Sequence, residues 1–271
     1  MEVKTPVTRD PRDILKGGIT TWQLPIDPSC APFARSVLRS AMTALGLPDD
    51  VIDDGTLAVS ETATNAWRYG PQPGPCDPII PPELWLWARV TPKPQLVVTV
   101  FDANREWEHP ACLADSLDEG GRGLGIVANV SDGSGMHWSR SQIGTWRAPG
   151  KAFWYALPLP GPWADPAITA DPAYAASRLQ ALLGARGSGD VQVSNEKGVS
   201  LVSIPSGLNV WVGPKTFTFN DTDGTHVQRP LLDLQDLTEH LIQRIEEDGY
   251  PSPCPVEHPA GSVEGNRRPV G

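Results

Sequence analysis

The stretch Leu96-Val97-Val98-Thr99-Val100-Phe101 is followed directly by Asp102, and it decides how the surrounding chain must fold. It is almost entirely apolar and rich in β-branched residues, which is typical of a strand buried on both faces. A carboxylate at the end of such a strand lies at the edge of a sheet, where ligands often bind. We therefore expect a central strand over residues 96–101 and a candidate binding residue at Asp102.

The sequence around this strand predicts a two-layer domain. Turn residues and β-rich runs predict four further strands, over residues 18–24, 84–90, 136–141 and 152–157. Apolar residues at helical spacing predict helices over residues 31–45, 49–69 and 121–130. The expected apolar faces are Phe33, Val37, Leu38, Ala41 and Leu45 on the first helix, and Leu124, Val127 and Ala128 on the third. This order predicts an α+β fold, a two-layer α/β sandwich with a mixed, mostly antiparallel sheet and helices on one face.

Proline-rich and polar segments divide the chain into units. We expect a disordered arm over 1–17, a first domain over 18–160, a linker over 161–172, a small α+β domain over 173–248 and a disordered tail over 249–271. In the second domain we expect helices over 173–185 and 231–247 and strands over 191–194, 199–204, 208–212 and 216–219. Residues 71–82 hold six prolines and read as a surface loop.

Composition excludes several functions. The chain has 271 residues and a formal net charge of −10, so nucleic acid is not expected as its main partner. It has no apolar run of roughly 18 residues that would cross a membrane, and its beginning lacks the apolar core of a secretory signal. We therefore expect a cytoplasmic location. The four cysteines form no CxxC pair and the five histidines are scattered, so no zinc site is predicted.

The first cluster that could carry chemistry is Val59-Ser60-Glu61-Thr62-Ala63-Thr64-Asn65-Ala66, on the second predicted helix. Glu61 and Asn65 are four residues apart and share a helix face. A carboxylate and an amide oxygen on one face suit a hydrated Mg²⁺, and the carboxylate could also orient an attacking group. Taken alone, the pair is more often an ordinary solvated helix face.

The other two clusters are Val100-Phe101-Asp102-Ala103-Asn104 and Glu119-Gly120-Gly121-Arg122-Gly123-Leu124-Gly125. A carboxylate at the position of Asp102 can accept the exocyclic amine of adenine, although a turn cap is the more common explanation of such a residue. The glycines open a helix, where bare backbone and the helix dipole favour phosphate oxygens, and Arg122 could add a charged contact. A flexible glycine turn explains this cluster equally well.

Together the three clusters resemble the GHKL ATPases, a superfamily that includes histidine-kinase catalytic domains and topoisomerase ATPase domains. The resemblance covers about residues 18–160, and the stretches 57–66, 121–127 and 150–154 are similar to the branch of anti-sigma-factor serine/threonine kinases.

The resemblance implies ATP and Mg²⁺ as cofactors, and it implies a role for each cluster. Asn65 would bind Mg²⁺, and Glu61 would be the catalytic base. Asp102 would read adenine, assisted by the following turn at Asn104. The glycine segment, which consists of Gly121, Arg122, Gly123, Leu124 and Gly125, would line the phosphates beneath a lid over 104–120.

The resemblance also implies a protein partner, either a sigma factor or an anti-sigma-factor antagonist that receives phosphate on Ser or Thr, and it is compatible with a homodimer. The chain departs from many relatives at Asn104, where they carry glycine; asparagine tolerates a left-handed backbone, so a turn can form there. A catalytically inactive protein-binding module with the same fold is the alternative. A two-component histidine kinase fits less well, because no dimerisation helix with a phospho-accepting histidine precedes the domain.

Two features stay open on sequence alone. Trp85 and Trp87 alternate with leucines, so they lie on one face of their strand, which either docks a partner or packs inside the protein. Residues 173–247 carry no recognisable motif, so the role of the second domain is not predicted.

Overall fold

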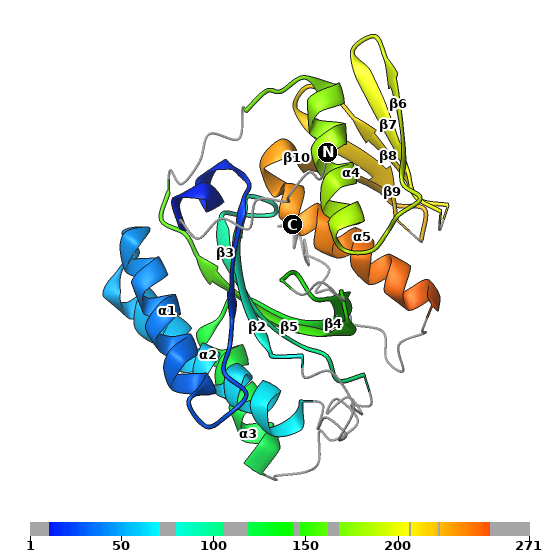
Figure 1. The fold of residues 1–271 in the computed structure, drawn as a ribbon. Coiled ribbons are helices and arrows are strands. Elements are labelled where there is room, and N and C mark those ends of the chain that lie inside the picture. The colour runs from blue at the N-terminus through cyan, green and yellow to red at the C-terminus, as the bar shows by residue number, and fades with distance from the viewer. Residues whose placement is uncertain are drawn as a thin grey trace, which may run out of the picture.

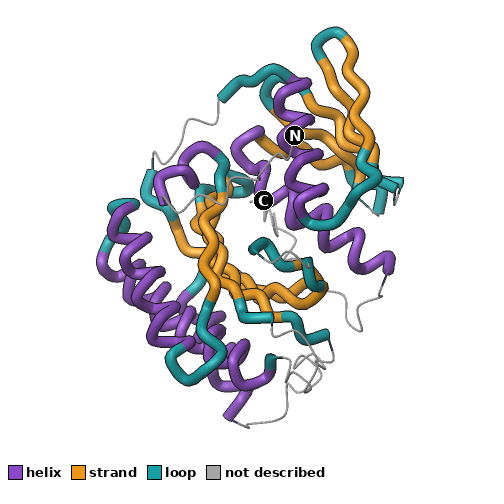
Figure 2. The backbone as a smooth tube through the Cα atoms, viewed as in Figure 1, coloured by secondary structure: helices purple, strands orange, loops and turns teal. Residues whose placement is uncertain are grey.

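The computed structural model describes residues 11–70, 80–105, 119–143, 147–161, 168–205, 207–221 and 223–249. Figure 1 shows two α+β domains packed against each other, and Figure 2 shows that the sheet of the first domain lies between two layers of helices. This confirms the predicted α+β class. None of the described helices combines the length and the apolar character that a membrane crossing requires.

The first domain contains a 3-10 helix, three α-helices and a five-stranded sheet. Its elements are η1 (Pro11–Lys16), β1 (Ile19–Gln23), α1 (Cys30–Ala44), α2 (Asp49–Tyr69), β2 (Glu83–Arg89), β3 (Gln95–Asp102), α3 (Glu119–Val130), β4 (Gly133–Arg140) and β5 (Pro149–Pro158). The strand order is β1-β2-β3-β5-β4, and all these pairings are antiparallel. As predicted from its apolar sequence, β3 is central, and all eight of its residues are buried.

One face of this sheet packs against α1, α2 and α3 (Figure 1). Helix α2 packs closely against both α1 and β5 at Gly55. An added Cβ there would lie 2.8 Å from Cδ1 of Leu157 and 3.0 Å from the Met42 side chain. Tyr155 on β5 is fully buried, and its hydroxyl donates a 2.8 Å hydrogen bond to the Gly55 carbonyl. This contact fixes α2, which carries two of the predicted site residues, on the sheet.

The second domain covers the other face of the first sheet. Its elements are α4 (Pro172–Ala185), β6 (Gln192–Glu196), β7 (Val199–Ser203), β8 (Asn209–Val212), β9 (Thr216–Asn220), β10 (His226–Pro230), η3 (Leu231–Asp233) and α5 (Leu234–Gly249). The strands form an antiparallel meander that packs its apolar face against α4 and α5. Helix α5 also contacts β2 and β4 of the first sheet.

Trp85 and Trp87 lie on the sheet face that the second domain covers, and both are almost fully buried. Trp85 stacks on Phe101 with ring centroids 5.2 Å apart, and the Arg186 guanidinium lies 4.9 Å from the Trp85 ring centroid. The face that could have docked a partner therefore packs inside this chain.

Four expectations need correction. Residues 11–16 form η1 rather than part of a disordered arm, because Ile14 is buried in the helix-side core. Phe33 and Ala128 are exposed, since the buried stripes of their helices are centred on neighbouring residues. Strand β10 was not predicted, because it is an edge strand with little apolar sequence.

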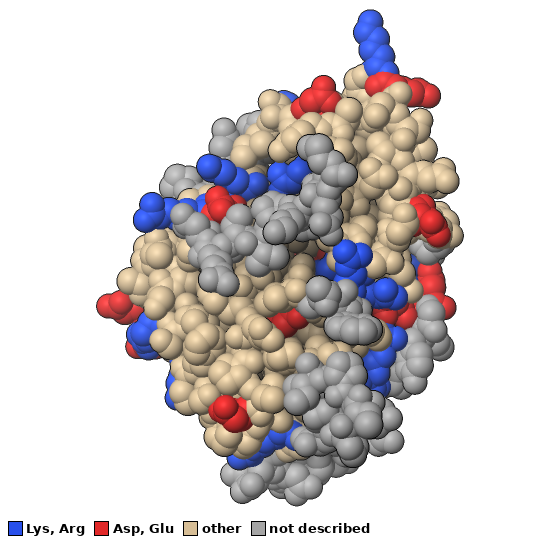
Figure 3. Space-filling view, viewed as in Figure 1, with Lys and Arg blue, Asp and Glu red and all other residues tan. Residues whose placement is uncertain are grey.

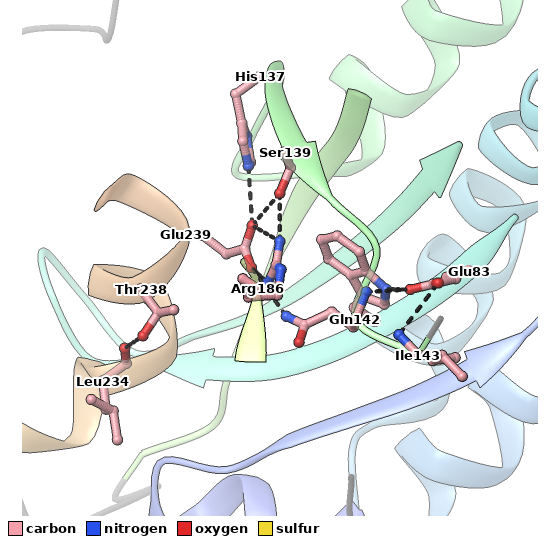
Figure 4. Close-up of polar contacts among 10 residues, drawn as sticks. Glu83, His137, Ser139, Gln142, Ile143, Arg186, Leu234, Thr238 and Glu239 are labelled. Carbon is pink, nitrogen blue, oxygen red and sulfur yellow. Dashed lines mark hydrogen bonds and ion pairs between the residues drawn. The ribbon is translucent and has the colours of Figure 1, made fainter. Parts of the chain in front are cut away.

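A buried ion pair of the second domain lies at the junction, where side chains of the first domain bond to it (Figure 4). Arg186, which follows α4, pairs with Glu239 of α5, and both side chains are at most 4% exposed. Ser139 on β4 donates to Glu239 at 2.9 Å and accepts from Arg186 at 2.6 Å. Gln142 donates to the same carboxylate at 3.1 Å. Side chains of both domains thus contribute the hydrogen bonds of the Arg186–Glu239 ion pair.

Two further carboxylates lie near the junction, and one of them, Asp233, bonds across it. Glu83 is buried and accepts hydrogen bonds from Trp85 Nε1 and from the Gln142 backbone, each at 2.8 Å. Asp233 accepts the backbone N–H groups of Val90 and Thr91 at 2.7 and 3.2 Å. Burial raises the pKa of Asp233 to about 6 despite these donors. The hairpin between β2 and β3 is therefore fastened to the second domain.

We predict that Glu239→Ala lowers the free energy of unfolding by about 3–5 kcal/mol, because it leaves the Arg186 charge buried without its partner. Urea denaturation of the full chain measures this loss. Asp53→Ala is the control: its pair with Arg39 is exposed, with side chains 70% and 55% accessible, so removing it should cost less than about 1 kcal/mol. Equal losses in the two variants would contradict the assignment.

The lowered pKa of Glu239 predicts that the stability of the protein depends on pH in the acid range. Burial raises the pKa of Glu239, but Arg186 and the hydrogen bond of His137 lower it further, to about 2 from an ordinary 4.5. The unfolded chain therefore binds more protons between these values, and stability falls as the pH drops from about 4.5 towards 2. Glu239→Gln should flatten this part of the stability curve. An unchanged slope in the variant would show that other groups determine the acid sensitivity.

Candidate functional site

The first cluster, residues 59–66, lies on helix α2. Its buried stripe packs on the sheet through Ile52, Val59, Ala63 and Ala66. Glu61 and Asn65 lie beside this stripe and are half-buried. The side chains of these two residues make no hydrogen bond within the described part of the chain. Two polar groups on one helix face thus remain able to bind a ligand.

The third cluster contacts the first at Gly123. This buried glycine of α3 lies so close to α2 that an added Cβ would be 2.6 Å from Oε2 of Glu61. Real Cβ atoms do not approach another atom so closely, so glycine is required wherever Glu61 keeps this position. The structure therefore brings Glu61 to the first turns of α3, as the motif order predicts.

Asp102 ends β3 and is only 5% exposed. Its Oδ1 accepts from Lys151 Nζ at 2.8 Å and from the Asn104 backbone N–H at 3.0 Å. No hydrogen bond reaches Oδ2 from the described residues. The carboxylate is thus fixed through one oxygen, while the other can accept a further donor.

The protonation of Asp102 depends on two opposing effects. Burial raises the pKa of this carboxyl, and the neighbouring Lys151 ammonium and the Asn104 N–H act in the opposite direction. Burial has the larger effect, so the pKa of Asp102 lies above its ordinary value, and the Lys151 ammonium limits this rise.

Asn104 joins the second cluster to the first. Its side-chain Nδ2 donates to the carbonyl of Tyr69 at 2.7 Å, one helical turn after Asn65. The turn is held by this bond and by the bond to Asp102, and Asn104 does not adopt the left-handed backbone that its tolerance would allow. The turn after β3 thus contacts the end of α2, and α3 contacts α2 at Glu61.

The remaining predicted residues are described less fully. Gly121 and Arg122 lie in the first turns of α3, and their side chains are outside the described residues. Leu124 is half-buried, whereas Gly125 is exposed and an added Cβ there would meet no atom within 4 Å. Most of the predicted lid, 106–118, and of the proline-rich loop, 71–79, also falls outside the described residues.

Lys151 and Arg105 are the two contacts to the site that sequence reasoning did not assign. Lys151 is the register partner of Asp102 on β5, so pairing the two strands in sequence would have brought them together. Arg105 forms an ion pair with Glu246 of α5, and its guanidinium lies 5.8 Å from the Trp138 ring centroid. No local sequence signal predicts this contact, because 141 residues separate the partners.

The arrangement suits an ATP-type ligand with a hydrated divalent cation. Mg²⁺ prefers oxygen ligands, keeps several waters and is commonly held by one or two side chains together with substrate phosphates. The amide oxygen of Asn65 meets this requirement, and bound Mg²⁺ would neutralise phosphate charge. Among the described residues no group of three or more His, Cys, Asp or Glu residues could hold a metal, so such an ion would depend on the nucleotide for further ligands.

Comparison with known protein families matches part of the first domain. Residues 24–146 match the family model described as the histidine kinase-like ATPase domain. No curated protein matches the chain. The matched range contains Glu61, Asn65, Asp102 and the glycine segment, and it stops before Lys151 and the second domain. Residues 24–146 are therefore similar to the histidine kinase-like ATPase domains.

Proposed function

We propose that the first domain binds ATP together with Mg²⁺ and that the chain is a regulatory protein acting on a protein partner. One observation carries the proposal: Gly123 contacts Glu61, and Asn104 bonds to Tyr69, so the three elements that carry the clusters, α2, α3 and β3, contact one another there. The family match of residues 24–146 supports the same reading.

In this proposal each residue has a separate role. Asp102 accepts the adenine amine through Oδ2, while Lys151 and Asn104 hold Oδ1. Asn65 contributes an oxygen to Mg²⁺, and the backbone of the first turns of α3, from Gly121 to Gly125 with Arg122 and Leu124, faces the phosphates. Glu61 acts as the base that orients or deprotonates the attacking hydroxyl or water.

The partner and the reaction follow from the resemblance to anti-sigma-factor kinases. We propose a cytoplasmic regulator that binds a sigma factor or an antagonist of an anti-sigma factor, and that transfers the γ-phosphate to a Ser or Thr of that antagonist. Phosphoryl transfer depends mainly on positioning and electrostatic stabilisation, which the cluster of Asn65, Glu61 and α3 could supply. Such a protein could also act as a homodimer.

A second candidate is a GHKL-fold module that binds a protein without turnover. Two observations favour it: Asp102 is already paired with Lys151, and Arg105, beside the adenine-reading turn, is tied to Glu246 of the second domain. Both ion pairs could keep the nucleotide site in one conformation. Nucleotide binding and nucleotide turnover therefore need separate tests.

Binding is tested with two variants. We expect Asp102→Ala and Asn65→Ala each to weaken Mg·ATP binding at least about tenfold in isothermal titration calorimetry, because each removes a polar contact worth about 1.5–3 kcal/mol to a charged or buried group. Only Asn65→Ala should also reduce the dependence of affinity on Mg²⁺.

The control is Asp132→Ala. Asp132 also pairs with a lysine, Lys93, at 3.0 Å, but it lies beside the opposite end of β3, where its side chain accepts from Gln95. Its loss should leave ATP affinity unchanged. If Asp102→Ala and Asn65→Ala bind ATP as the control does, the site assignment is wrong.

Turnover is tested with Glu61→Gln. This variant keeps the size of the side chain beside Gly123 but loses the base, so we expect ATP binding within about twofold of the wild type and phosphate release or transfer reduced at least about 100-fold. A wild-type protein that binds ATP but neither releases nor transfers phosphate would favour the inactive module instead.

A further inference from the structure

A cavity of about 210 Å³ lies at the junction of the domains, away from the nucleotide clusters. Residues of both domains line it: Asp13 and Lys16 of η1 and Ile19 of β1 from the first, Arg178 and Leu182 of α4 and Gln235 of α5 from the second. In the view of Figure 3, Lys and Arg side chains gather on the surface over η1, next to an acidic group. The cavity is smaller than the roughly 300–1,000 Å³ of sites for drug-sized molecules, so it suits a small metabolite.

Gln235 is the unusual member of this lining. It is only 2% exposed, and its amide oxygen has no hydrogen-bond partner among the described residues. Buried polar atoms in folded proteins are nearly always hydrogen-bonded, and an exception often marks a position that a ligand or water completes. A ligand that brings a hydrogen-bond donor to this amide would complete it.

The charges around the cavity define the rest of the ligand. Lys16 and Arg178 are cationic and Asp13 is anionic, and within the described residues no ion pair joins them. Arg178 uses one of its N–H groups, which donates to the Tyr174 hydroxyl at 3.3 Å, and retains others for a ligand. Two cations and one carboxylate around a small apolar wall match a molecule that carries both an acidic and an amino group.

We propose that this cavity binds a small zwitterionic metabolite of the amino-acid class. The ligand carboxylate pairs with Lys16 and Arg178, and its ammonium group donates to Asp13 and to the amide oxygen of Gln235. The apolar wall formed by Ile19 and Leu182 receives the side chain. Because these residues come from both domains, the bound ligand bridges the junction. The proposal does not depend on ATP binding.

The test is thermal shift followed by calorimetry on the full chain without nucleotide or Mg²⁺. The probes are the standard L-amino acids, one at a time at millimolar concentration, with acetate, inorganic phosphate and methylamine as single-charge probes. We expect at least one amino acid to bind saturably and to raise Tm, and the single-charge probes to bind at least about tenfold more weakly.

Gln235→Met and Arg178→Ala should each weaken that binding at least about tenfold, whereas Lys215→Ala, an exposed lysine of the second domain, should not change it. Gln235→Met replaces an unsatisfied buried amide with an apolar side chain of similar length, so the variant should fold as stably as the wild type without ligand. The proposal is overturned if no amino acid binds, if acetate or phosphate binds as tightly as any amino acid, or if both variants bind as the wild type does.

Discussion

The first sheet must bury both of its faces, and the arrangement of the whole chain follows from this constraint. Every residue of β3 is buried, and the tryptophans of β2 are as deeply buried as the leucines between them. Helices α1 to α3 cover one face, and α5 with Arg186 covers the other. With both faces occupied, the end of the sheet at Asp102 remains as the place where α2, α3 and β3 can form a polar site.

Much of this could be predicted from local sequence. The period of the apolar residues and the positions of proline and glycine predicted the helices and strands of the first domain to within a few residues, including α2 over Asp49–Tyr69. The order of the three clusters along the chain singled them out as site candidates, because each motif contains the residue types that its chemistry requires, and their nucleotide-binding roles stay a prediction. Contacts such as that of Gly123 with Glu61 agree with that order.

What could not be predicted depends on contacts between distant residues. The sequence shows that Trp85 and Trp87 share a face, but only the packed domains show that α5 and Arg186 cover it. The bridge between Arg186 and Glu239 joins residues 53 positions apart, and neither lies in a motif. The exposure of Phe33 reflects how α1 is rotated on the sheet, which helical spacing leaves uncertain by one position.

Helix α5 connects the features that were not predicted. Gln235 near its start lines the junction cavity, Glu239 forms the buried bridge, and Glu246 near its end pairs with Arg105 beside the turn that follows β3. One rigid element thus contacts both the junction and the rim of the candidate nucleotide site. The second domain is placed to influence that site as well as to complete the core.

The central claim is that three sequence clusters surround one nucleotide. A crystal structure of the full chain with Mg²⁺ and a non-hydrolysable ATP analogue tests it most directly. In that structure we expect the adenine amine to donate to Oδ2 of Asp102, the metal to contact the Asn65 oxygen and the phosphates to lie over the first turns of α3. An analogue bound elsewhere on the molecule, with Asp102 and Asn65 making no contact to it, would contradict the account.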